Sequence, residues 1–129
     1  MTGDLYPTVT HDLSNMRRAL APDAASAFNG FSKAVFADGA LPGRTKQIIA
    51  VAVAHVTQCP YCIRGHTRAA LRQGASHEEL MEAVWVAAEM RAGAAFAHSI
   101  IAISEMGDAE EGAIDHPPQA SAAGEHHGQ

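Results

Sequence analysis

Apolar residues recur at helical spacing through most of the chain. In residues 22–37, four large side chains follow one another at intervals of three or four: Phe28, Phe31, Val35 and Phe36. This spacing is typical of one face of an amphipathic helix. Pro22 suits a first helical turn and Gly39 follows the last apolar position, so the pattern predicts a helix over 22–37.

The next segment, residues 43–57, contains the run IIAVAVAHV. Its β-branched residues are also compatible with a buried strand. The length of the segment and its interleaved alanines favour a helix, and its continuous apolarity places that helix near the centre of the fold. A third helix is predicted to begin at Pro60 and to end at Gly74, with three arginines on one solvent-facing stripe: Arg64, Arg68 and Arg72.

A capping-box pattern marks the start of the last helical region. Ser76 is followed three residues later by Glu79, and apolar residues begin directly afterwards. The helical pattern continues from His77 to about Met106, with Arg91 and Gly93 interrupting it, so we expect two helices or one bent helix. No segment alternates as a strand would, and the predicted fold is therefore all-α, with about five to six helices.

Composition divides the chain into a core and two flanking segments. We expect an N-terminal segment at 1–20, a helical core at 21–106 and a disordered acidic tail at 107–129. From Glu105 onward there are six acidic residues and no Lys or Arg, so the formal net charge of −5 belongs to the tail and the body is about neutral. The tail also holds His116, His126 and His127, which could bind a metal weakly.

The same features exclude several classes of protein. The N-terminus lacks a basic stretch followed by an apolar one, which argues against a secretory signal. The run from Ile48 to Val56 is far shorter than the roughly 20 residues that span a bilayer, so no membrane association is expected. The negative charge disfavours nucleic acid. Two cysteines are too few for a disulfide-stapled secreted scaffold, and a cytoplasmic protein is expected.

Candidate chemistry is concentrated in the stretch from His55 to His66. Cys59 and Cys62 form a C-x-x-C motif at the predicted start of a helix, where backbone N–H groups and the helix dipole stabilise a thiolate. His66 lies four residues beyond Cys62, on the same helical face, where it can exchange a proton with a thiol. These residues predict thiol redox chemistry.

Two other interpretations of this stretch stay open. Four residues, His55, Cys59, Cys62 and His66, follow the spacing i, i+4, i+7, i+11 and could form one stripe of metal ligands. A zinc ribbon would need a second cysteine pair, which the chain lacks. The cysteines could also be two small buried thiols without a chemical role.

The run KQIIAVAVAHVTQCPYCIRGHTRAA, from Lys46 to Ala70, together with the following GASHEELMEAVWVAAEM, resembles the core of the alkylhydroperoxidase D (AhpD) and carboxymuconolactone decarboxylase superfamily, in its C-x-x-C-x-x-x-H branch. The resemblance covers about residues 20–105. It implies an all-helical domain that assembles into trimers or hexamers. It also implies reduction of hydroperoxides by the cysteine pair, which a lipoyl-type or thioredoxin-like dithiol donor re-reduces, with no cofactor.

The resemblance further implies a role for each site residue. Cys62 corresponds to the peroxidatic cysteine, Cys59 to the resolving one, and His66 to the histidine that joins a proton relay to the thiol. The relay glutamate of the family falls on Gln47, which can orient a water molecule but cannot accept a proton at neutral pH. Tyr61 stands where well-studied members have a histidine before the second cysteine.

Three further ionisable residues fall in segments that the pattern predicts to be buried: His55, Glu89 and His98. Buried ionisable groups are usually paired, so each is a candidate for the relay or its surroundings, and an ion pair with Arg91 is an alternative for Glu89. The leading hypothesis is a cytoplasmic thiol-dependent hydroperoxide or disulfide reductase that forms homo-oligomers. The alternatives are a metal-binding or interaction module and a decarboxylase-type lyase, for which the cysteine pair is not needed.

Overall fold

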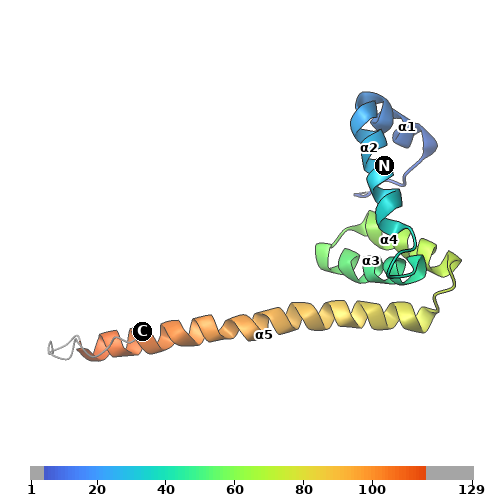
Figure 1. Ribbon diagram of the computed structural model, residues 1–129. Helices are drawn as coiled ribbons and strands as arrows, with labels where there is room; N and C mark the ends of the chain where they lie inside the picture. Colours follow the sequence, from blue (N-terminus) through green and yellow to red (C-terminus); the bar gives the residue numbers. More distant parts are fainter. Residues whose placement is uncertain (1–4, 116–129) are drawn as a thin grey trace. The chain divides into compact units, whose positions relative to one another are not determined.

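The computed structural model describes residues 5–115, and the side chains of 5–110, as five helices joined by short turns (Figure 1). The helices are α1 (His11–Leu20), α2 (Pro22–Phe36), α3 (Gly43–Thr57), α4 (Pro60–Arg72) and α5 (His77–Asp115). The described part of the chain contains no strand. The all-α prediction is confirmed, and the expected helices over 22–37 and 43–57 match α2 and α3 closely.

The chain divides into two compact units, Met1–Ala87 and Ala88–Gln129. The first unit contains α1 to α4 and the beginning of α5. The described part of the second unit is the remainder of α5. The cysteine motif lies entirely in the first unit.

Helix α1 was not expected within the N-terminal segment 1–20. Thr10 caps it, since its hydroxyl accepts a hydrogen bond from the backbone N–H of Leu13 at 3.2 Å. Arg17 and Arg18 lie in its last turn, where they complement the helix dipole. The helix buries none of its residues.

Polar contacts fix the end of α2 to the beginning of α3. The ammonium group of Lys46 donates to the backbone carbonyls of Val35 at 2.9 Å and Ala37 at 2.6 Å, and so caps the C-terminus of α2. The N–H of Gly43 donates to the Asp38 carboxylate at 2.6 Å. A Cβ at Gly43 would lie 3.1–3.3 Å from neighbouring oxygens, so a side chain there would require small shifts of these groups.

The core of the first unit is small and made mainly of short side chains. Its central cluster joins α3, α4 and the start of α5 through Val51, Ala70, Ala75 and Leu80, with Ile48 and Val84 packed against it. Val51 is the largest side chain that is almost completely buried, at 2% exposure. Aromatic residues make up only 5% of the chain, and short side chains such as Ala70 and Ala75 pack in this core instead.

The start of α5 is held by the predicted capping box. The backbone N–H of Glu79 donates to the Ser76 hydroxyl at 3.0 Å, and the N–H of Ser76 donates to the Glu79 carboxylate at 2.9 Å. Arg44 of α3 forms an ion pair with the same carboxylate. The Ser76 N–H and the Arg44 guanidinium together lower the pKa of Glu79.

Helix α5 differs from the expectation in two respects. It is one continuous helix rather than two helices or a bent one, because neither Arg91 nor Gly93 breaks it. Gly93 is covered by the Glu89 side chain, whose Oε2 would lie 3.4 Å from an added Cβ. The helix also continues to Asp115, so the predicted tail is helical over 107–115. Residues 116–129, with His116, His126 and His127, lie outside the described residues.

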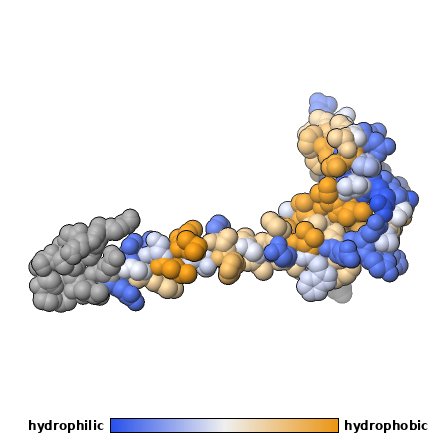
Figure 2. Space-filling view, turned by 60° about the horizontal axis from the view of Figure 1, so that its bottom comes forward, coloured by the Kyte–Doolittle hydropathy of each residue, from blue (hydrophilic) through white to orange (hydrophobic). Residues whose placement is uncertain are grey.

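The second unit leaves many apolar side chains exposed, and Figure 2 shows them as orange atoms along α5. Six large side chains there are 57–82% exposed: Met90, Phe96, Ile100, Ile101, Ile103 and Met106. By length and composition, the stretch His77–Glu110 is also apolar enough to cross a membrane, with a window of mean hydropathy 1.3. Single-stretch signals of this kind are weak, since helices that pack in soluble proteins give the same pattern.

The capping box yields a stability prediction. Replacing Ser76 by Ala removes one side of the box and is expected to lower the free energy of unfolding by about 1 kcal/mol. The measurement is urea unfolding followed by far-UV circular dichroism at fixed protein concentration. Ser26→Ala, at an exposed position within α2, is the matched control and should leave the midpoint almost unchanged. Equal effects of the two substitutions would contradict the assignment.

Candidate active site

The cysteine motif begins at the turn between α3 and α4. Gln58 ends α3 in the left-handed conformation, with φ 58° and ψ 49°. Cys59 then takes an extended conformation and acts as the N-cap of α4, and Pro60 occupies the first helical position. The backbone N–H of Cys62 donates to the Cys59 sulfur at 3.3 Å. The prediction that Cys59 caps the helix is confirmed.

The Cys59 and Cys62 sulfur atoms lie 2.7 Å apart, in hydrogen-bond contact. Both are free cysteines in this structure. Both cysteines are half-buried. They are placed to form a disulfide with little movement of the backbone, and one face of the pair remains accessible to a small reactant.

Hydrogen bonding shifts the pKa values of the two thiols in opposite directions. The pKa of Cys59 is lowered, first by the hydrogen bond from the Cys62 thiol and then by the backbone N–H groups of Cys62 and Tyr61. The pKa of Cys62 is raised, because its proton is held by Cys59 and because burial disfavours a second charge. The reduced pair therefore loses its first proton readily and keeps the second, shared between two sulfurs.

Gln47, His66 and Phe36 form a cluster beside this motif. Gln47 is buried, at 7% exposure, and its Oε1 lies 2.7 Å from Nδ1 of His66. An amide oxygen can only accept, so Nδ1 of His66 carries the proton and Nε2 is the nitrogen left for proton exchange. The imidazole stacks on the Phe36 ring, with centroids 4.9 Å apart and an interplanar angle of 25°. Gln47 and His66 are thus brought together, as expected, whereas the role of Phe36 was not foreseen.

The other ionisable candidates lie elsewhere. His55 is half-buried, and its Nδ1 contacts the Val51 carbonyl at 2.7 Å within its own helix. It lines an apolar cavity of about 410 Å³ with Ile63, Leu71 and other side chains, and neither cysteine belongs to that lining. Glu89 and His98 belong to the second unit and are exposed. The expectation that they are buried is wrong for the single chain, because no other element of the second unit's described part covers α5.

The four-ligand metal stripe is also not formed. The spacing from His55 to His66 would produce one stripe only on a continuous helix, and the left-handed residue Gln58 reverses the chain in the middle of it. Nδ1 of His66 is already engaged by Gln47. Over the side chains of residues 5–110, no three His, Cys, Asp or Glu groups converge as metal ligands.

Tyr61, between the two cysteines, ties the N-terminal segment to α4. Its hydroxyl donates to the Pro7 carbonyl at 3.0 Å, and its ring meets that of Tyr6 edge to face, with centroids 6.0 Å apart. The sequence identified Tyr61 only as a departure from the related histidine. The contact with a segment 54 residues away could not be inferred from spacing.

The fold and the site together define an all-helical dithiol protein whose cysteine pair caps a helix. Its sequence matches the Carboxymuconolactone decarboxylase family over residues 22–105. The chain belongs to this family, which confirms the resemblance recognised in the sequence.

Individual relatives extend this comparison. The chain is 71% identical over 73 residues to a Paracoccus denitrificans protein named uncharacterized protein 4 in cox locus, over 57% of this chain and 66% of that relative. A crystal structure from Methanobacterium thermoautotrophicum is 37% identical, with a TM-score of 0.61, over 64% of this chain and 93% of the other. A carboxymuconolactone decarboxylase family protein of Legionella pneumophila is 34% identical, with a TM-score of 0.57, over 63% and 75%.

The opposite pKa shifts of Cys59 and Cys62 predict which thiol is labelled first. Because the pKa of Cys59 is lowered and that of Cys62 raised, Cys59 should be the first to react with iodoacetamide between pH 6 and 8. Replacing Cys62 by Ala removes the thiol donor, so the pH midpoint for labelling Cys59 should rise toward the ordinary thiol value. Peptide mass spectrometry after timed quenching measures both rates. Preferential labelling of Cys62 at every pH would contradict the hydrogen-bond assignment.

Proposed function

We propose that the protein is a thiol-dependent hydroperoxide reductase that cycles its cysteine pair between dithiol and disulfide. The observation that carries the proposal is the contact between Cys59 and Cys62, whose sulfurs lie 2.7 Å apart at the N-terminus of α4. Helix N–H groups stabilise negative charge there, and a single shared proton leaves one sulfur as a nucleophile. Membership of the family supports this reaction class.

In the first step, Cys62 acts as the peroxidatic cysteine. Its proton passes to the Cys59 thiolate, whose sulfur lies 2.7 Å away, and this leaves the negative charge on Cys62. The Cys62 thiolate attacks the terminal peroxide oxygen, an S–O bond forms and the O–O bond breaks. Cys62 becomes a sulfenic acid, and the departing alkoxide takes the proton held by Cys59 and leaves as an alcohol.

In the second step, Cys59 acts as the resolving cysteine. Its thiolate attacks the sulfur of the Cys62 sulfenic acid, a disulfide forms, and the expelled hydroxide is protonated to water. An external dithiol, of lipoyl or thioredoxin type, then reduces the disulfide by two electrons and returns two protons. Such a donor is maintained in a reducing compartment, so a cytoplasmic location belongs to the same proposal.

His66 and Gln47 organise proton movement in this scheme. Gln47 holds Nδ1–H of His66, and Nε2 is then free to accept or return a proton during the cycle. Because Gln47 cannot itself be protonated at neutral pH, any proton taken by His66 must return to solvent or to the thiol pair. Gln47 is therefore a positioning residue, and His66 is the acid–base group.

The scheme is tested by separating the two cysteines. Cys62→Ser should abolish consumption of cumene hydroperoxide, whereas Cys59→Ser should consume one equivalent and stop as a sulfenic acid. Stopped-flow peroxide consumption, with dimedone trapping and mass spectrometry, measures both outcomes. His77→Ala, on an exposed residue at the start of α5, is the control. If Cys59→Ser is inactive and Cys62→Ser turns over once, the roles are exchanged. If both variants match the parent, the proposed function is wrong.

We also propose that the functional form is a homo-oligomer, a trimer or hexamer as the family resemblance implies. The core of the first unit contains few large side chains, and the described part of α5 exposes apolar residues that a soluble monomer rarely leaves in water. Association of copies through these faces removes that surface from water, at about 25 cal/mol per Å² of apolar area.

Assembly is tested at Phe96, which is 82% exposed. Phe96→Glu places a charge on the proposed contact face, so it should shift the protein toward monomer in sedimentation velocity at micromolar concentration. Ala94→Glu, at an exposed position about 160° round α5 from Phe96, adds the same charge on the other side of the helix and should shift it less. A parent protein that stays monomeric at all concentrations would contradict the proposal.

A further inference from the structure

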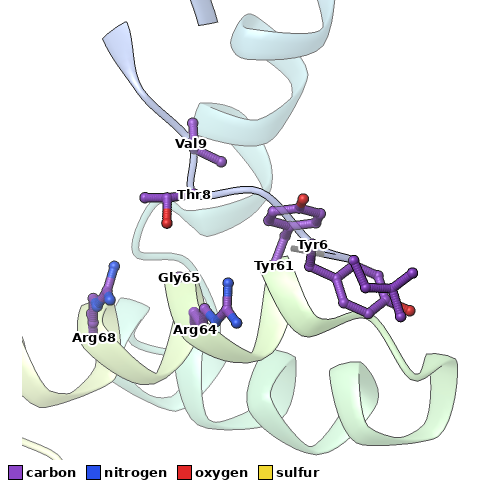
Figure 3. Close-up of a pocket in the computed structure, with 8 residues that line it drawn as sticks. Tyr6, Thr8, Val9, Tyr61, Arg64, Gly65 and Arg68 are labelled. Carbon is purple, nitrogen blue, oxygen red and sulfur yellow. The ribbon is translucent and has the colours of Figure 1, made fainter. Parts of the chain in front are cut away.

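The N-terminal segment and α4 enclose an open cavity of about 640 Å³ in the first unit (Figure 3). The walls come from Leu5, Tyr6 and Thr8 on the segment and from Tyr61, Arg64 and Arg68 on the helix. Gly65 also lines the cavity, and the absence of a side chain there keeps the helix surface open between the arginines. The volume lies within the range of small-molecule sites, which are roughly 300–1,000 Å³.

One end of this cavity is positively charged. Arg64 and Arg68 lie one turn apart on α4, and Figure 3 shows both guanidinium groups turned toward the N-terminal segment near Thr8. The lining includes no Asp or Glu. Among the described residues, neither guanidinium is paired with a carboxylate. Two adjacent guanidinium groups without an acidic partner attract a carboxylate and can bind it through several N–H donors.

The other end of the cavity is apolar and held in place. Tyr6 and Tyr61 meet edge to face there, and the Tyr61 hydroxyl is already used by the Pro7 carbonyl. The Tyr61 ring and the exposed side chain of Leu5 therefore offer hydrocarbon surface, and the ring of Tyr6 adds to it. Tyr61 and Arg68 are separated by two turns, about 10 Å along the helix axis, which leaves room for a medium-length chain between the charged and apolar ends.

We propose that this cavity binds an amphipathic carboxylate, a small molecule with one acid group and a medium-length hydrocarbon chain. The acid group contacts Arg64 and Arg68, and the chain lies along Tyr61 and Tyr6. The site is distinct from the cysteine pair and does not depend on the proposed peroxide chemistry. The N-terminal segment, outside the family match at 22–105, supplies half of its walls.

The test is calorimetric titration of the full-length, reduced protein with sodium decanoate at low ionic strength. Decan-1-ol and acetate separate the contributions of chain and acid group, and both should bind much more weakly than decanoate. The double variant Arg64→Ala/Arg68→Ala should weaken decanoate binding by about tenfold or more, since hydrogen bonds to charged groups contribute strongly. Raising the salt concentration should reduce the affinity of the parent and have little effect on the double variant.

Arg72→Ala is the matched control, because Arg72 is exposed on the same helix but does not line the cavity. It should bind decanoate like the parent. Tyr61→Ala should weaken decanoate binding and leave the weak binding of acetate unchanged. No binding of decanoate to the parent, or equal losses in Arg72→Ala and the double variant, would overturn the proposal. Peroxide consumption by the double variant is measured separately, so failure of this site and failure of the redox function are distinguishable.

Discussion

The N-cap formed by Cys59 is the contact on which both the fold and the chemistry of the first unit depend. Most helices are capped by an oxygen of Ser, Thr, Asp or Asn, whereas here a sulfur accepts the N–H of Cys62. The N–H groups that need an acceptor at the start of α4 also lower the pKa of the Cys59 thiol. Helix capping and thiol activation are therefore one interaction, and loss of the thiolate charge on oxidation weakens the cap.

A second constraint comes from the buried amide of Gln47. A carboxylate at this position would bring a charge into a site that is 7% exposed, and it would need a cationic partner to remain ionised. Gln47 instead forms a neutral hydrogen bond with His66, whose ring is stacked on Phe36. In the proposed redox cycle, Gln47 cannot serve as the terminal proton acceptor, so protons would move only among His66, the two sulfurs and solvent.

The sequence predicted α2, α3, α4 and the start of α5, together with residues that mark the helix boundaries. Helix boundaries were predicted from residues with known preferences for helix ends: Pro22, Gly74 and Ser76. Gly74 indeed has a positive φ of 95°. The same reasoning failed at α1, which buries nothing, and along α5, where helix propensity carried the chain past Gly93 and on to Asp115. Periodicity did not report burial either, because Phe28 and Phe31, which predicted α2, are 66% and 64% exposed.

Within the site, residues on α3 and α4 were predicted because both helices were recognised and their spacing is fixed by helical geometry. Contacts made by other elements were not predictable. Phe36 reaches His66 from the end of α2, and Tyr61 reaches Pro7 across 54 positions. The predicted stripe of metal ligands was wrong because it assumed one continuous helix from His55 to His66. A single left-handed residue, Gln58, reverses the chain, and one-dimensional spacing contains no information about that reversal.

The proposed association between copies would place the charged side chains of α5 at a lower cost than insertion into a lipid bilayer. Glu89, Arg91 and His98 lie near the middle of the apolar stretch. Placing a residue such as Arg at the centre of a membrane costs about 2.5–3.5 kcal/mol, and an acid adds a similar cost. At a protein interface the same side chains can stay at the solvent rim while Phe96 and Ile100 are buried. A small, Ala-rich core gains most from such shared apolar faces, because it has little large-side-chain surface of its own to bury.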